Sequence, residues 1–140
     1  MSKVAVVFWS ATGNTEAMAN AVAEGAKEKG AEVTVFGAGE FSADKVSEFD
    51  AIAFGCPAMG AEVLEETEFE PMFASVETSL GGKKIGIFGS YGWGDGQWMR
   101  DWKERCDSTG AALVNDGVMA NNAPDDAALD ECKDLGASLA

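Results

Sequence analysis

The chain has 140 residues, of which 46% are hydrophobic and 24% charged, and this composition predicts one globular domain with a proper core. Its formal net charge of −14 argues against nucleic acid and anionic membranes as partners. No apolar stretch has the length of a membrane span and no secretory signal is visible, so we expect a cytoplasmic protein whose three cysteines stay reduced.

Strand and helix patterns alternate from one end of the chain to the other. In chain order, we expect strands over residues 3–9, 32–36, 50–54, 84–89 and 111–119, the last being weaker, and helices over 16–29, 66–79, 97–108 and 125–139. The segment 37–49 is expected to be irregular, and a bend is expected at residues 116–117. Such an alternation predicts a three-layer α/β domain with right-handed crossovers, in which ligands bind at the carboxyl ends of the strands.

A tight turn rich in hydroxyl groups follows the first strand. Its sequence is Ser10-Ala11-Thr12-Gly13-Asn14-Thr15, and it leads directly into the first helix. The first turn of a helix has unpaired N–H groups and a dipole that favours negative charge, and a glycine lets the backbone approach a ligand closely. Because the turn contains no Lys or Arg, we expect a phosphate here to be held by neutral dipoles and not by an ion pair.

Two further loops follow the third and fourth strands, and they are expected to meet the first loop at one edge of the sheet. The second loop spans residues 55–62 and contains Met59, and the third spans residues 89–96 and contains Tyr91 and Trp93. A phosphate turn beside a thioether and an aromatic ring suits a flat aromatic ligand with a phosphate tail. Taken singly, Met59 and Trp93 would more often be packing residues.

The acidic residues and the other tryptophans allow plainer interpretations. The acidic runs within residues 62–70 and 125–134 form either solvated helix faces or a docking field around the site. Trp9 is a candidate for the floor of the site, whereas Trp98 and Trp102 are expected to pack a helix against the sheet. The cysteines are expected to be small buried residues.

Several other protein classes with related folds lack their required residues here. A receiver domain needs an acidic pair after the first strand and an aspartate at the end of the third, where this chain has Ser10-Ala11 and Gly55-Cys56. The Cys-x5-Arg motif of low-molecular-weight phosphatases and the P-loop motif are both absent. The chain has no histidine, which weakens most acid–base and metal chemistries.

Three motifs, taken together, give the chain a family resemblance. They are the turn over residues 10–15, the loop Cys56-Pro57-Ala58-Met59-Gly60 and the loop Gly89-Ser90-Tyr91-Gly92-Trp93-Gly94, and Asn122-Ala123-Pro124-Asp125 precedes the last helix. With these motifs in order, the chain resembles a short-chain flavodoxin from end to end, and its fifth-strand region has no room for the insertion of long-chain members. The resemblance implies a three-layer, doubly wound flavodoxin-like sandwich with a five-stranded parallel sheet in the order 2-1-3-4-5.

The resemblance also implies a cofactor and the residues that bind it. Flavodoxins are one-electron carriers that bind FMN non-covalently, so residues 1–140 would form a single FMN-binding domain. The turn over residues 10–15 would hold the phosphate, Met59 would cover the inner face of the isoalloxazine and Trp93 its outer face. The cofactor-binding residues that the resemblance implies are Ser10, Ala11, Thr12, Gly13, Asn14, Thr15, Pro57, Ala58, Met59, Gly60, Ala61, Glu62, Ser90, Tyr91, Gly92, Trp93, Gly94 and Asn122.

The redox switch of this family falls on the peptide between Gly60 and Ala61. By resemblance, this peptide flips on one-electron reduction, and the Gly60 carbonyl then accepts a hydrogen bond from the protonated flavin N5. Glycine suits the position because a positive φ costs it little. Several relatives carry Asp, Asn or Ser after the glycine, so the apolar Ala61 removes any extra side-chain hydrogen bond from the flipped turn.

The resemblance implies a low-potential carrier that shuttles between semiquinone and hydroquinone and has no substrate turnover of its own. A site without cations, in a chain of charge −14, disfavours the anionic reduced flavin. The expected partners are redox proteins with basic docking surfaces, such as a reductase or ferredoxin-dependent-type enzymes, and the protein is expected to be a monomer without a metal. The alternatives are a flavin-dependent reductase of the same fold that binds NAD(P)H or a quinone, and an FMN storage module.

Overall fold

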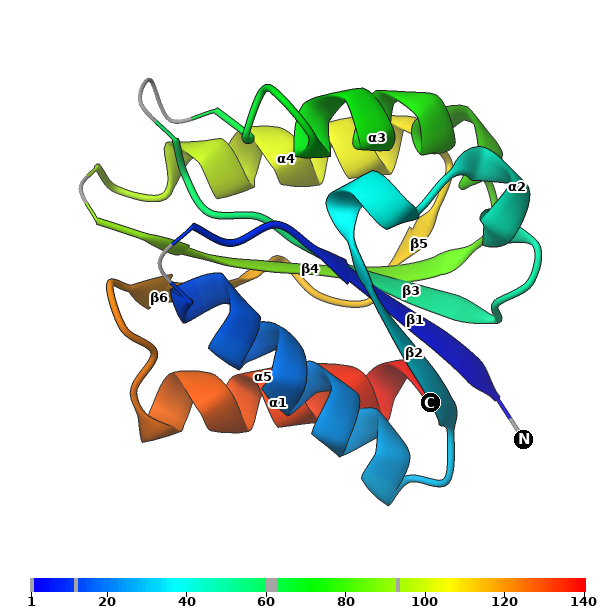
Figure 1. Ribbon diagram of the computed structural model, residues 1–140, viewed down its shortest axis with the longest axis horizontal. Helices are drawn as coiled ribbons and strands as arrows, with labels where there is room; N and C mark the ends of the chain where they lie inside the picture. Colours follow the sequence, from blue (N-terminus) through cyan, green and yellow to red (C-terminus); the bar gives the residue numbers. More distant parts are fainter. Residues whose placement is uncertain (1, 12, 60–62, 93) are drawn as a thin grey trace.

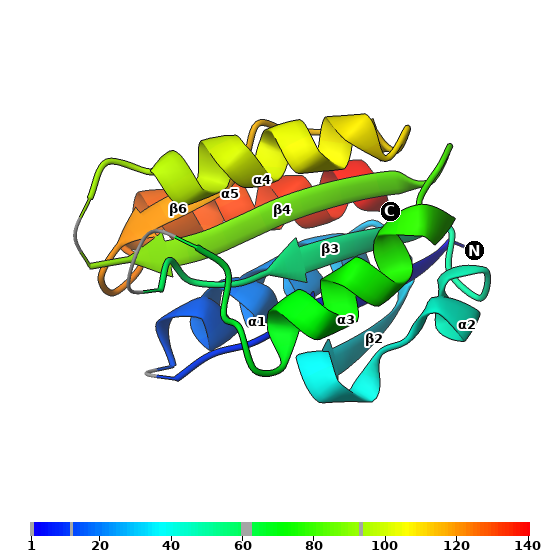
Figure 2. The ribbon, with the colours of Figure 1, turned by 90° about the horizontal axis from the view of Figure 1, so that it is seen from above.

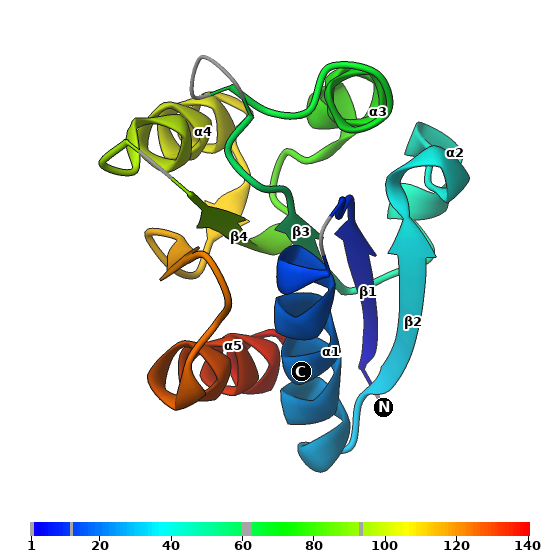
Figure 3. The same ribbon diagram turned by 60° about the vertical axis from the view of Figure 1, so that its left-hand side comes forward.

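The computed structural model describes residues 2–11, 13–59, 63–92 and 94–140, and its strands form one sheet (Figure 1). The strands are β1 (Lys3–Phe8), β2 (Glu32–Gly37), β3 (Ala51–Gly55), β4 (Lys84–Tyr91), β5 (Ala112–Leu113) and β6 (Val118–Asn121). The helices are α1 (Asn14–Glu28), α2 (Ala43–Val46), α3 (Phe69–Val76), α4 (Gln97–Ser108) and α5 (Asp126–Leu139), with short 3₁₀ turns at η1 (Ala38–Glu40) and η2 (Glu77–Ser79). Helices α1 and α5 cover one face of the sheet, and α3 and α4 cover the other (Figures 2 and 3).

The sheet has the order β2-β1-β3-β4-β5, with β6 paired to β4 beyond the end of β5, and every pair is parallel. This confirms the three-layer doubly wound fold and the strand order that the resemblance implies. The central strands are covered on both faces, and Val4, Val7, Ile52 and Phe54 are fully buried. Such strands require continuous apolar sequence, which is why the pattern of β1 and β3 could be recognised. The carboxyl ends of β1, β3 and β4 emerge at the same edge of the sheet.

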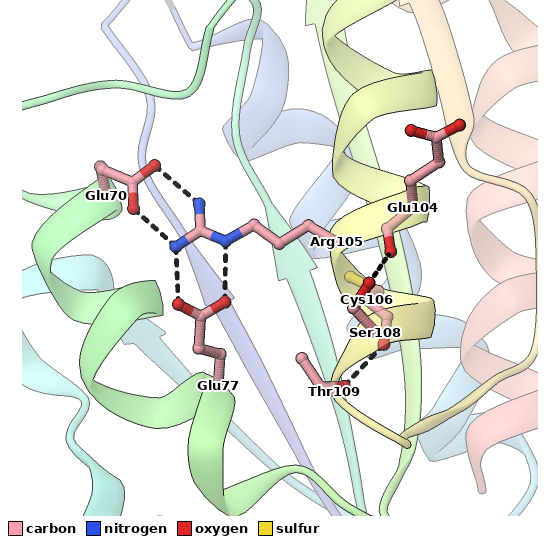
Figure 4. Close-up of polar contacts among 7 residues, drawn as sticks. All are labelled: Glu70, Glu77, Glu104, Arg105, Cys106, Ser108 and Thr109. Carbon is pink, nitrogen blue, oxygen red and sulfur yellow. Dashed lines mark hydrogen bonds and ion pairs between the residues drawn. The ribbon is translucent and has the colours of Figure 1, made fainter.

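The face covered by α3 and α4 has an aromatic core. Phe73 of α3 meets Trp102 of α4 edge to face, with 5.9 Å between the ring centroids. Arg105 of α4 reaches across to pair with Glu70 of α3 at 2.7 Å and with Glu77, which directly follows α3, at 2.8 Å (Figure 4). Its guanidinium also lies over the Phe73 ring, 4.9 Å from the centroid. Long side chains therefore join these two helices.

The opposite face has a core rich in alanine and brings α1 and α5 into backbone contact. A Cβ atom added to Gly25 would lie 2.0 Å from the carbonyl oxygen of Lys133, and one added to Gly136 would lie 1.9 Å from that of Val22. Any side chain at either position would collide with the backbone of the other helix. The position of α1, including its first turn, is therefore fixed by a contact that only glycine permits.

The segments 37–49 and 66–79 differ in detail from the sequence-based expectation. The segment 37–49 is not wholly irregular, because Glu40 accepts a hydrogen bond from the Gly37 N–H at 2.8 Å, which closes the turn η1, and the short helix α2 follows. The helix expected over residues 66–79 begins at Phe69, and Pro71 falls in its first turn, where the missing N–H is not needed.

The fifth strand is interrupted, and a side chain fills the interruption. β5 pairs with the start of β4 and β6 with its end. Between them, the Asn115 side-chain oxygen accepts a hydrogen bond from the Ile87 N–H at 3.3 Å, and its side-chain amide donates to the Ile87 carbonyl at 3.2 Å. The expected bend at residues 116–117 is thus accompanied by a side-chain amide that takes the place of strand backbone on β4.

Candidate functional site

The carboxyl ends of β1, β3 and β4 meet around one cleft of about 300 Å³. The cleft is lined by Ser10, Ala11, Asn14, Thr15, Pro57, Ala58, Met59, Ser90, Tyr91, Gly92 and Asn122. All of these are residues that the sequence analysis placed at the site. Gly13 and Gly94 are not part of the lining. The predicted residues Thr12, Gly60, Ala61, Glu62 and Trp93 lie outside the described residues.

The first wall of the cleft is the turn between β1 and α1. Gly13 precedes the helix with a φ of 93°, a conformation that favours glycine, and its N–H donates to the Ser10 hydroxyl at 3.1 Å. Asn14 and Thr15 begin α1 and line the cleft. Among the described residues, no side chain caps the first turn of this helix. The turn therefore presents N–H groups and a positive dipole end to whatever occupies the cleft.

The second wall is the segment after β3. Ala58 donates its N–H to the Ser90 carbonyl at 3.0 Å, which ties this wall to β4. Met59 exchanges two backbone hydrogen bonds with Val63, at 2.9 and 3.3 Å. The backbone is therefore fixed on both sides of residues 60–62.

The third wall comes from the end of β4 and from the residue that follows β6. β4 extends to Tyr91, so Ser90 and Tyr91 belong to the strand and not to the glycine-rich loop in which they were expected. The Ser90 hydroxyl lies 3.1 Å from that of Thr15 in a buried contact between the first and third walls. Asn122, with a φ of 58°, donates its N–H to the Tyr91 carbonyl at 2.7 Å. The three walls are thus joined to one another by hydrogen bonds.

The tryptophans outside the third loop do not line the cleft. Trp98 and Trp102 are buried and pack α4 against the sheet, as predicted. Trp9 does not line the cleft, because its indole N–H turns toward Glu68 and donates to that carboxylate at 2.8 Å.

All three cysteines are buried and free, as expected, and burial raises the pKa of the Cys132 thiol to about 12. A thiol that stays protonated at neutral pH offers no nucleophile.

The cleft offers neutral polar groups at one end and apolar surface at the other. No charged side chain is present in its described lining. Pro57, Ala58, Met59 and Tyr91 supply the apolar part, which fits a flat ring system, and the α1 turn supplies donors that fit a phosphate. Over the same described part of the chain, no cluster of Cys, Asp and Glu has the arrangement of a metal site, and no helix is long and apolar enough to cross a membrane.

Sequence reasoning missed the burial of one glutamate that follows the second loop. Glu65 was assigned to an acidic run of solvated or docking residues, but its side chain is buried, with 4% of its surface exposed. Its carboxylate accepts hydrogen bonds from the backbone at the start of α3. The sequence gives no clear signal for this role, because Glu65 lies four residues before Phe69, the first residue of α3, and several neighbouring residues are also glutamates.

Comparison with known proteins gives consistent results over nearly the whole chain. The family model of flavodoxin matches residues 6–136. The flavodoxin of Megasphaera elsdenii is 47% identical over 137 residues, which cover 98% of each chain, and that of Clostridium beijerinckii is 44% identical over 135 residues, which cover 96% of this chain and 97% of the other. The solution structure of two-electron reduced Megasphaera elsdenii flavodoxin has a TM-score of 0.90 at 46% identity, with 97% of both chains covered.

Proposed function

The chain belongs to the flavodoxin family and is an FMN-binding electron carrier without substrate turnover of its own, and on that basis we propose that the cleft at the ends of β1, β3 and β4 is its FMN site. Its role is to carry single electrons between redox partner proteins, with the FMN cycling between semiquinone and hydroquinone. One observation carries the assignment of the site. The first turn of α1, without a side-chain cap among the described residues, opens on a cleft whose described lining holds hydroxyl and amide groups but no charged side chain.

We place the FMN phosphate at the turn over residues 10–15. The Ser10 and Thr15 hydroxyls, the Asn14 amide and the N–H groups of the first helical turn are the donors of this wall. Backbone and hydroxyl dipoles can hold an anion without a cation when they converge at a helix N-terminus. Thr12 and Gly13 complete the set by resemblance to the family.

We place the isoalloxazine between the second and third walls. Met59 would cover the inner face and Trp93 the outer face, while the backbone of residues 58–62 and 90–94 would line the pyrimidine edge. This is supported by the Met59 side chain in the cleft lining and by the bridge from Met59 to Val63, which brackets the Gly60–Ala61 peptide proposed as the redox switch. Asn122, at the end of β6, would form part of the loop wall.

The charge of the chain supports a low reduction potential of the flavin and partner proteins with basic docking surfaces. With a net charge of −14 and no charged group in the described cleft lining, the chain disfavours an added negative charge on the flavin, which favours a low potential. The same charge favours partners with basic docking surfaces, such as a reductase or ferredoxin-dependent-type enzymes. We further propose that residues 1–140 act as a monomeric FMN-binding domain in the cytoplasm.

Replacement of Ser10 tests the phosphate assignment. We expect Ser10→Ala to weaken FMN binding by the apoprotein roughly tenfold, because one hydrogen bond to a charged group is lost. Riboflavin, which has no phosphate, should bind the variant and the wild type about equally. The matched control is Ser108→Ala, since the Ser108 hydroxyl donates to the Glu104 carbonyl within α4 and Ser108 is not part of the described cleft lining. If Ser10→Ala weakened both ligands by the same factor, the phosphate would not lie at this turn.

The salt dependence of FMN binding gives a second readout. A phosphate held by lysine or arginine would be released as salt screens the ion pair. Here the phosphate approaches a chain of charge −14 and finds only neutral donors in the described lining, so added salt should screen repulsion and tighten binding modestly. Riboflavin binding should be unaffected. An FMN dissociation constant that rises with salt would argue for a cationic phosphate site.

A further inference from the structure

We propose that Glu65 is a positioning residue that fixes two walls of the cleft through the start of α3. The inference rests on the assignment of this cleft to FMN. It concerns a side chain that does not line the cleft, and three steps connect it with the walls.

The first step is the Glu65 carboxylate itself. One of its oxygens accepts from the Thr67 N–H at 2.8 Å and from the Thr67 hydroxyl, and the other accepts from the N–H groups of Glu68 and Phe69 at 2.7 and 2.9 Å. Burial by itself raises the pKa of this carboxyl, but the hydrogen bonds outweigh it and hold the pKa below the usual value. The group is therefore a buried carboxylate that orders the backbone of residues 67–69.

The second step leads to the wall formed by residues 57–59. The Glu65 N–H donates to the Cys56 sulfur at 3.3 Å, so the two ends of the segment 56–65 are joined directly. Cys56 is in turn tied to the sheet and to α4, because its N–H donates to the Phe88 carbonyl at 3.1 Å and its carbonyl accepts from the Trp98 indole at 3.1 Å. A shift of Glu65 would release one end of this loop while the other end stayed in place.

The third step leads to the wall formed by the α1 turn. Glu68, whose N–H is held by Glu65, accepts a hydrogen bond from the Trp9 indole at 2.8 Å. Trp9 stands directly before Ser10, the first residue of the phosphate turn. The same carboxylate therefore supports the loop after β1 through Glu68 and Trp9, and the loop after β3 through its own N–H and Cys56.

The neighbouring glutamate provides a matched control. Glu66 is exposed, whereas Glu65 is buried, and replacement of either by glutamine removes one negative charge from the same segment. In Glu65→Gln, an amide NH₂ group would face donors that need an acceptor, so the start of α3 would shift. In Glu66→Gln only the charge changes. A difference between the two variants therefore reports on position and not on charge.

The experiment measures the dissociation constants of FMN and riboflavin and both one-electron midpoint potentials, at low and high salt. We expect Glu65→Gln to weaken both ligands roughly tenfold, since buried hydrogen bonds to a charged group are lost. We also expect it to change the separation of the two midpoint potentials by an amount that salt does not remove. Glu66→Gln should leave both affinities within about twofold and shift the potentials only by a screened amount.

The proposal would be overturned if Glu65→Gln and Glu66→Gln changed the dissociation constants and midpoint potentials equally. It would also be overturned if the Glu65→Gln protein were less stable but had wild-type affinities and potentials. If the apoprotein of Glu65→Gln does not fold, Thr67→Val removes a single donor to the same carboxylate and should shift the affinities in the same direction by a smaller factor; no shift in that variant would also overturn it. Failure of the FMN site assignment would be recognised separately, because Ser10→Ala would then weaken the binding of FMN and of riboflavin by the same factor.

Discussion

Two helices begin close to the cleft, and their first turns are satisfied in opposite ways. The first turn of α1 has no side-chain cap among the described residues and opens on the cleft. At the start of α3, the carboxylate of Glu65 accepts the N–H groups of Thr67 and Glu68 in the preceding turn and that of Phe69, the first residue of the helix. A helix N-terminus attracts an anion in either case. For α1 we propose that the FMN phosphate is that anion, whereas at α3 it is the carboxylate of Glu65.

The bodies of the two helices are held in different ways as well. α1 lies against α5 by backbone contact at Gly25 and Gly136, where no side chain fits. α3 is joined to α4 by the side chain of Arg105 and by aromatic rings. The turn proposed to hold the phosphate is therefore placed by a rigid backbone contact, and the start of α3 by longer and more adaptable side chains.

The largest expected effect comes from breaking the contact that places α1. Gly136→Ala would put a Cβ atom 1.9 Å from the Val22 carbonyl oxygen. We expect it to lower the free energy of unfolding by about 3 kcal/mol, through overpacking against backbone. Urea denaturation of the apoprotein measures this. The control in the same helix, Ala137→Gly, should cost about 1 kcal/mol through helix propensity alone. A Gly136→Ala protein as stable as the wild type would show that the helices can separate freely.

A smaller effect is expected where α3 is joined to α4. Arg105→Lys keeps the charge but loses the planar fork that pairs with Glu70 and Glu77 at once (Figure 4). We expect the free energy of unfolding to fall by about 2 kcal/mol, because half-buried carboxylates lose hydrogen bonds. Lys103→Met is the control, since Lys103 pairs with Asp107 on the exposed side of the same helix and should contribute little. Similar stabilities for the two variants would mean that the fork does not matter.

The smallest effect is expected from acid, through the cap of α3. The pKa of Glu65 is lowered in the folded chain, so as the pH falls the unfolded chain takes up this proton first. The stabilisation by the carboxylate is complete above the ordinary glutamate pKa of about 4.3 and is lost below it. The gap in unfolding free energy between wild type and Glu65→Gln should therefore be constant near neutral pH and shrink in acid. Urea denaturation at a series of pH values measures it, and a gap that persists at low pH would contradict the expectation.

Much of the site could be predicted because it depends on local sequence. A hydroxyl-rich turn between an apolar strand and a helix has one interpretation on physical grounds, and the cleft lining contains Ser10, Asn14 and Thr15 as expected. Met59 and Tyr91 were ambiguous when taken singly. Their place in the cleft follows from the order of the parallel strands, which brings their loops to one edge. The family resemblance supplied that order.

The supports behind the site could not be predicted, because they depend on tertiary contacts. Glu65 and Glu66 are identical in type and adjacent, yet one is buried and the other exposed. Only the folded chain shows that Glu65 meets Cys56 and the start of α3. Trp9 was a candidate for the floor of the cleft, but its sequence position does not show where its indole points. In the folded chain the indole N–H donates to Glu68 instead.

The interrupted fifth strand has a consequence for how such a chain can change in length. Between β5 and β6, the edge of β4 at Ile87 is already satisfied by the side chain of Asn115. The backbone at the next position, Asp116, is therefore not needed by the sheet, and its side chain is 92% exposed. Extra residues inserted there can leave the surface and return with both short strands still paired. This interval is where the fold can acquire new sequence while the walls of its cleft keep their places.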